Sequence, residues 1–118
     1  MKIEKKGEIP LYRASNELLF LLTDVIKEIE RSYKHTIGVK VIEENIELIK
    51  RIAKANKASS KELRKRYIEE AEGVTDSIVL LLRALYEKRK ISLKHYTKSS
   101  EMLENISRQL SGWKKTVN

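Results

Sequence analysis

The residues best placed to do chemistry in this chain are cations. Eight lysines and arginines lie between Leu48 and Ile68, with Glu62 as the single acid among them. They are Lys50, Arg51, Lys54, Lys57, Lys61, Arg64, Lys65 and Arg66. The dipole at the start of a helix mildly disfavours positive charge, so stability alone does not favour this arrangement. Clustered cations bind phosphate groups, and we expect this stretch to bind a polyanion, the alternative being a solvated charged surface.

Further basic residues are expected at both ends of a helical bundle. One group would join the first cluster, and it consists of Arg108, Lys114 and Lys115. The opposite end would gather Arg31, Lys34, His35, Lys88, Arg89 and Lys90. We predict that these residues bind nucleic acid or a partner protein, and that reversing the charges of Arg64 and Arg66 weakens binding.

Catalytic and metal-binding patterns are absent from the sequence. His35 and His95 do not lie in a metal-ligand spacing such as His-Glu-x-x-His, and the chain contains no cysteine. The four glycines are isolated, so no phosphate-binding loop is predicted. No spacing suggests a Ser/His/acid group or a pair of catalytic carboxylates. We therefore predict a protein that is not an enzyme and that needs no metal or cofactor.

Aromatic residues offer surfaces for stacking on bases or for packing against another subunit. Tyr67, Tyr96 and Trp113 fall on apolar stripes, which favours the core or an oligomer contact. We predict that Tyr96 and Trp113 contact another subunit. Tyr86, close to the cations at 88–90, is the best candidate for stacking on a base.

Apolar residues recur at helical spacing in four segments that would position these side chains. The segments are 10–34, 39–56, 60–86 and 92–117. Ile37 and Gly38 are predicted to form the break between the first two helices, and Ser92 is predicted to cap the last helix. Residues 59–62 have the spacing of a capping box, and Gly73 suggests the close approach of another helix. No alternating strand pattern occurs, so we predict an all-α, antiparallel up-down-up-down four-helix bundle.

The chain of 118 residues has the size of one domain and a net charge of +8. We predict a flexible lead at 1–9 and a single domain at 10–118. No apolar run is long enough to cross a bilayer, and the first residues lack the apolar stretch of a secretion signal. A cytoplasmic protein without a membrane partner is therefore expected, and its charge favours polyanionic partners.

Several short segments, taken in order, resemble one known family. Arg-Ser-Tyr-Lys-His-Thr-Ile-Gly lies at 31–38 and Ala-Lys-Ala-Asn at 53–56. Leu-Leu-Arg-Ala-Leu follows at 81–85 and Ile-Ser-Arg-Gln-Leu-Ser-Gly-Trp at 106–113. Over about residues 10–117 the chain resembles the accessory variability determinant (Avd) proteins of diversity-generating retroelements. These belong to a wider group of four-helix bundles that includes proteins encoded in intervening sequences of 23S ribosomal RNA.

The resemblance implies a function that composition does not show. Avd proteins are non-enzymatic, basic homopentamers that bind the reverse transcriptase of their element. With the template RNA, that complex makes error-prone cDNA for retrohoming into a target gene. The resemblance thus implies a reverse transcriptase and RNA or DNA as partners. Membership of the wider group alone implies the alternative, a structural or interaction protein without a reverse transcriptase partner.

Overall fold

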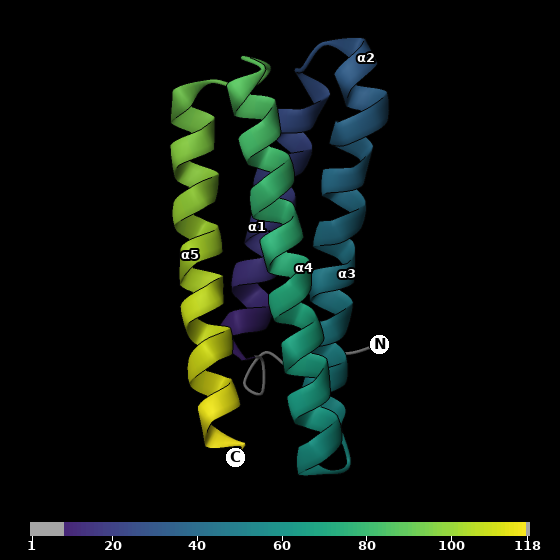
Figure 1. Cartoon of the computed structure of the whole chain (residues 1–118), viewed down its shortest axis with the longest axis vertical. Helices are drawn as coiled ribbons and strands as arrows, with labels where there is room; N and C mark the ends of the chain where they lie inside the picture. The colour runs from purple at the N-terminus through teal and green to yellow at the C-terminus, as the bar shows by residue number, and fades with distance from the viewer. Residues whose placement is uncertain (1–8, 118) are drawn as a thin grey trace.

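The structure of residues 9–117, a computed structural model, consists of four helical columns (Figure 1). In chain order they are α1 (Pro10–Lys27), the run of α2 (Arg31–Tyr33), η1 (Lys34–Gly38) and α3 (Val39–Lys57), then α4 (Lys61–Glu87) and α5 (Leu93–Thr116). This part of the chain contains no strand, so the all-α prediction is confirmed for it. None of its helices is long and apolar enough to cross a membrane. Residues 1–8 of the predicted lead lie outside the described residues.

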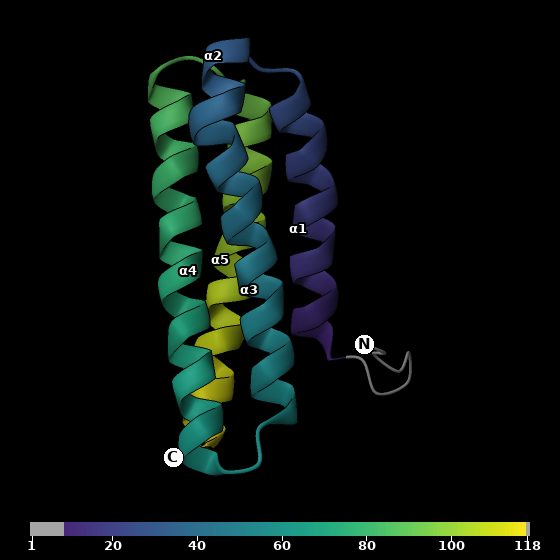
Figure 2. The ribbon, with the colours of Figure 1, turned by 90° about the vertical axis from the view of Figure 1, so that its right-hand side faces the viewer.

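The columns form a rod with extents of 44 × 25 × 22 Å. Both α1 and α4 pack against α3 and α5, so each column has two neighbours. Figures 1 and 2 show the connections 28–30 and 88–92 at one end of the rod. The connection 58–60 and the last turn of α5 lie at the other end. We call these the upper and the lower end, as they are drawn.

The first helix ends at Lys27, earlier than the predicted residue 34. The chain reverses over residues 28–30 and the second column begins at Arg31, so the predicted break at 37–38 is wrong. Ile29 explains the error. Its spacing continues the apolar stripe of the first helix, but its side chain is buried at the reversal itself.

Gly38 lies inside the second column instead of in a turn, with a helical φ of −60°. A Cβ at this position would lie 2.8 Å from Cγ2 of Ile26 and 3.2 Å from the carbonyl oxygen of Tyr33. The first separation is shorter than side chains tolerate without a shift. The missing side chain therefore lets the second column approach the end of α1.

Gly73 does not have the role that the sequence suggested. It is exposed on α4, and no heavy atom of another element lies within 4 Å of where its Cβ would be. The predicted close approach of a helix of the same chain is therefore wrong. Leu80, two turns further along α4, is also 67% exposed, and Phe20 on α1 is 69% exposed.

The ends of α4 and α5 carry serine caps. Ser92 accepts a hydrogen bond from the backbone N–H of His95 at 3.1 Å, which confirms the predicted cap. Ser60 accepts one from the N–H of Leu63 at 3.1 Å. Because Ser60 is the capping residue, Glu62 is only the second residue of α4, and the expected capping box does not form.

The core is built from leucine and isoleucine side chains of all four columns. Those without solvent exposure include Leu18, Leu22, Leu48, Ile52, Ile68, Ile78, Leu85, Ile106 and Leu110. One amide is buried among them. Asn45 Nδ2 donates a hydrogen bond to the Ser15 carbonyl at 3.2 Å and so joins α3 to α1. Its Oδ1 is buried and has no hydrogen-bond partner within residues 9–117.

Candidate nucleic-acid and partner interface

The predicted cluster at 50–66 spans the last turns of α3, the connection 58–60 and the first turns of α4. Its members therefore lie toward the lower end of the rod (Figure 1). Lys114 and Lys115, in the last turn of α5, lie at the same end. Lys50 and Arg108 lie higher, along the sides of α3 and α5. The prediction that these segments share one end is consistent with the placement of their elements.

Some cations of this cluster are neutralised by nearby acids. Arg51 lies 2.9 Å from Glu47 and 2.9 Å from Glu70, joining α3 to α4, although its Nε lacks a well-aligned hydrogen bond. Lys50 pairs with Glu47 at 3.1 Å, and Arg66 with Glu70 at 3.5 Å. The hydrogen bond from Lys50 lowers the pKa of Glu47 below its usual value. These cations have less net charge to offer a phosphate.

Arg64 is used by the fold itself. Its Nε donates a hydrogen bond to the Ala55 carbonyl at 2.9 Å, and its Nη2 donates a weaker one to the Ala58 carbonyl at 3.4 Å. These carbonyls belong to the end of α3, where helices leave acceptors without a partner. Reversing the charge of Arg64 would therefore disturb the connection 58–60, and the same substitution cannot report on binding alone.

Four lysines at this end form no ion pair with the described residues. We call them the lower lysines: Lys54, Lys57, Lys61 and Lys65. Lys54 Nζ lies 5.8 Å from the ring centroid of Tyr67, and the ammonium groups of the others form no hydrogen bond in this part of the chain. Three of the four are exposed and Lys65 is half-buried. They are the cations most available to an anionic partner.

The cations of α5 divide in the same way. Lys114 Nζ donates a hydrogen bond to Glu72 of α4 at 2.8 Å, and this bond raises the pKa of Lys114 above its usual value. Arg108 lies 3.4 Å from Glu104. Lys115 is exposed and forms no ion pair within residues 9–117. It adds one available charge to the lower end.

At the upper end, Lys40 pairs with Glu44 of its own helix at 3.9 Å, and Lys90 pairs with an acid of another segment. The Nζ of Lys90 donates a hydrogen bond to Glu30 across the two connections and lies 4.7 Å from the ring centroid of Tyr33. The hydrogen bonds from Lys90 and from Ser32 lower the pKa of Glu30. The hydrogen bond to Glu30 also raises the pKa of Lys90. The other predicted residues of this end form no ion pair with the described residues: Arg31, Lys34, His35, Lys88 and Arg89. Arg89 has a left-handed backbone, with a φ of 60°.

The aromatic candidates are mostly occupied within the chain. Tyr86 and Tyr96 stack with their ring centroids 4.3 Å apart and an interplanar angle of 2°. One face of Tyr86 is therefore not available to a base. Both rings stay half-buried, so the predicted oligomer contact of Tyr96 would involve only its remaining surface.

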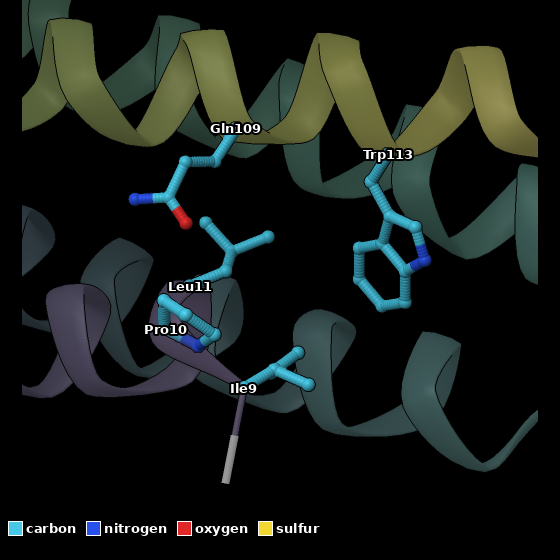
Figure 3. A pocket seen from close by; sticks show the side chains of 5 residues that line it. All are labelled: Ile9, Pro10, Leu11, Gln109 and Trp113. Carbon is cyan, nitrogen blue, oxygen red and sulfur yellow. The ribbon is translucent and has the colours of Figure 1, made fainter.

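Trp113 lines a recess that the sequence did not reveal (Figure 3). The recess has a volume of about 200 Å³, and its other walls are Ile9, Pro10, Leu11 and Gln109. It joins the start of α1 to the last turns of α5, so its residues come from opposite ends of the sequence. A pattern of residue spacing cannot predict that residues so far apart in the sequence lie together. Residues 9–117 contain no group of three or more histidine, aspartate or glutamate side chains that could hold a metal ion.

Comparison with known protein families identifies the family of the chain. A family model described as bAvd-like matches residues 11–117. The chain belongs to the bAvd-like family. The match includes all four columns, so the resemblance to Avd proteins is confirmed over the whole described bundle. A comparison with curated proteins finds no match. In this bAvd-like protein the available cations lie at both ends of the rod, while ion pairs occupy most cations along its sides.

Proposed function

We propose that this bAvd-like protein is a non-enzymatic accessory subunit of a diversity-generating retroelement. It binds the reverse transcriptase of the element together with template RNA or cDNA, and it supports mutagenic cDNA synthesis in the cytoplasm. The observation that carries this proposal is the family match over residues 11–117. We also propose that successive columns run in opposite directions, in an up-down-up-down topology. This topology would place the basic connections at the two ends of the rod.

The division between paired and available cations supports binding of nucleic acid by the ends of the rod. A lysine without a nearby acid gains most when a phosphate replaces its condensed counterions. Lys57, Lys61, Lys65 and Lys115 meet this condition, as do the available residues of the upper end. Lys54 meets it less well, because its charge helps to lower the pKa of Glu47. Paired residues such as Lys114 would first have to give up a carboxylate.

Exposed apolar side chains support assembly with further copies, which we take to be a homopentamer by family resemblance. A contiguous patch of large apolar residues in solvent marks a contact surface. Leu80 of α4 is 67% exposed and follows Val79, which is 44% exposed. Phe20 marks a second such position on α1, with an exposure of 69%. This proposal does not use the contacts predicted through Tyr96 and Trp113, which stay a prediction.

The proposal is tested by removing three available lysines at once. In a variant with Lys57→Ala, Lys61→Ala and Lys65→Ala, we expect weaker binding of a fluorescently labelled single-stranded RNA, measured by anisotropy across a salt series. Because each phosphate contact contributes about −0.7 to the slope of log K against log salt for a single strand, the loss of three contacts should make this slope less negative by about 2. A matched control removes three exposed but paired cations, with Lys50→Ala, Arg66→Ala and Arg108→Ala. Its slope should change much less.

Partner and assembly state are measured on the same proteins. We expect the chain to elute from size-exclusion chromatography together with the purified reverse transcriptase of its element. Light scattering should give the mass of five copies of the 13.8 kDa chain. Equal salt slopes for the two triple variants would reject the lower lysines as the binding site. If the chain binds neither RNA nor the reverse transcriptase, the proposed function is rejected.

A further inference from the structure

The recess beside Trp113 lies at the lower end of the bundle, where the available lysines also lie. Figure 3 shows Gln109 and Trp113 projecting from α5 toward the first residues of α1. The amide oxygen of Gln109 points toward Leu11, and the six-membered ring of the indole faces the space beside Ile9 and Leu11. Apolar side chains thus form the floor, and one amide stands at the rim.

The size of the recess limits what it can hold. Its volume of about 200 Å³ is below the roughly 300 Å³ of sites that take a whole small molecule. It is large enough for a single side chain or a single base. The occupant is therefore one group of a larger molecule, inserted as an anchor.

The polar groups of the recess distinguish between these two occupants. The side chains of Gln109 and Trp113 are half-buried, and neither forms a hydrogen bond with residues 9–117. An aliphatic side chain inserted here would remove the Gln109 amide from water without replacing its hydrogen bonds, at a cost in affinity. A planar group with apolar faces and with donors and acceptors along its edge matches both the apolar floor and the amide.

Charge favours the same occupant. Ile9 lines the recess and also lies beside Ala53 and Asn56 of α3. Ala53 in turn borders a groove that Lys54 and Lys57 line. The lower lysines lie at the same end of the rod. A strand that inserts a base beside Trp113 can therefore place neighbouring phosphates near cations.

We propose that this recess accepts one unpaired nucleobase, so that the protein prefers single-stranded to double-stranded nucleic acid. The inference rests on the proposed function in that nucleic acid must bind at the lower end. It adds a site, Trp113 with Gln109, and a form of ligand, a strand with a base free to leave its neighbours. A duplex offers the same phosphates but keeps its bases stacked and paired.

Trp113 is the only tryptophan of the chain, so its fluorescence reports on this recess alone. We would titrate the full chain with a labelled 12-nucleotide oligouridylate, a duplex of equal length and an oligomer of equal length without bases. Anisotropy follows binding, and tryptophan emission follows occupation of the recess. We expect the single strand to quench the emission on binding, while the duplex and the abasic strand leave it unchanged.

Substitutions give a second readout. Stacking on an aromatic side chain is usually worth enough that Trp113→Leu should weaken single-strand binding about 5- to 100-fold. Binding of the abasic strand should stay within about twofold. Gln109→Ala should reduce the preference for the strand with bases without changing the salt slope. Lys61→Ala is the matched control, because it should weaken both strands equally and leave the quenching at saturation unchanged. Thermal melting followed by circular dichroism verifies that each variant folds.

Each outcome decides between the competing occupants. Binding of all three ligands without quenching would overturn the base site while leaving the proposed function intact. Failure of every ligand to bind would reject the proposed function, and the base site with it. A change in emission with protein concentration alone, without nucleic acid, would show that a second copy covers the recess and would overturn the inference.

Discussion

Two glycines of the bundle predict opposite responses to the same substitution. Alanine is favoured over glycine inside a helix by about 1 kcal/mol. Gly38 and Gly73 both lie in helical segments, so both would gain this amount if nothing else changed. At Gly73 nothing else is expected to change, because no heavy atom of another element lies within 4 Å of the new Cβ. Gly73→Ala should therefore raise the free energy of unfolding by about 1 kcal/mol.

At Gly38 the new methyl group meets two rigid neighbours. Its Cβ would lie 2.8 Å from Cγ2 of Ile26, on a stiff β-branched side chain, and 3.2 Å from the carbonyl oxygen of Tyr33. Overpacking of this kind costs about 1–3 kcal/mol. After subtraction of the helix preference, Gly38→Ala should lower the free energy of unfolding by about 0–2 kcal/mol.

The two variants are compared with the unsubstituted chain by urea unfolding at one protein concentration. Light scattering verifies that all have the same assembly state, because Gly73 lies on an exposed face. The variants should differ from each other by about 1–3 kcal/mol, which corresponds to a difference in Tm of about 4–12 °C. Ile26→Leu supplies a control, since leucine lacks the γ2 methyl group. In the double variant with Gly38→Ala it should recover part of the loss.

Equal stabilisation by both substitutions would refute the reasoning, because it would mean that the second column does not approach α1 closely at Gly38. A loss at Gly38 that Ile26→Leu leaves unchanged would instead assign the clash to the Tyr33 carbonyl or to Cδ1 of Ile29, which would lie 3.3 Å from the new Cβ.

Two further substitutions test the buried amide and the ion pair of the upper end. Asn45→Leu should raise the urea midpoint, because the buried Oδ1 without a partner in the described chain costs about 1–3 kcal/mol. This exceeds the contribution of about 0.5–1.5 kcal/mol from the hydrogen bond to Ser15, which the substitution also removes. A lowered midpoint would show that the hydrogen bond from Asn45 to Ser15 outweighs the unpaired oxygen. Glu30→Gln should lower the Tm at pH 7. The lowered pKa of Glu30 gives a stabilisation that is present above its ordinary value of 4.5 and lost as the pH falls through the folded-state pKa. The Tm difference should therefore vanish in acid, and a difference independent of pH would contradict an electrostatic cause.

The sequence predicts those helices whose apolar spacing agrees with their ends. In α4 and α5 the apolar stripes indicate nearly the same boundaries that the structure has, and Ser92 identifies the start of α5. The periodic pattern does not predict the reversal at 28–30, because an apolar residue that is buried at a turn can have the same spacing as one that is buried within a helix. Gly38 and Gly73 were misread for a related reason, since a glycine alone does not reveal its neighbours.

The candidate site was predictable in composition but not in detail. Runs of cations identify the lower end, whereas pairing depends on contacts between distant segments. Lys90 meets an acid sixty positions away, and Lys114 meets one forty-two positions away. The role of Arg64 requires the geometry of the connection that it holds. The recess at Trp113 requires both ends of the chain to be folded together.

The π-turn η1 has a consequence for insertions and deletions in this family. One residue of an α-helix corresponds to a rotation of about 100°, so a deletion within α3 would turn its buried stripe away from the core on one side of the cut. The wider turn of η1 holds a residue more than an α-helical turn would. Loss of one residue there can restore plain α-helix locally, leaving the faces of α3 unchanged. Within the helical columns, the loss of a single residue is therefore best tolerated at 34–37, before the close contact of Gly38.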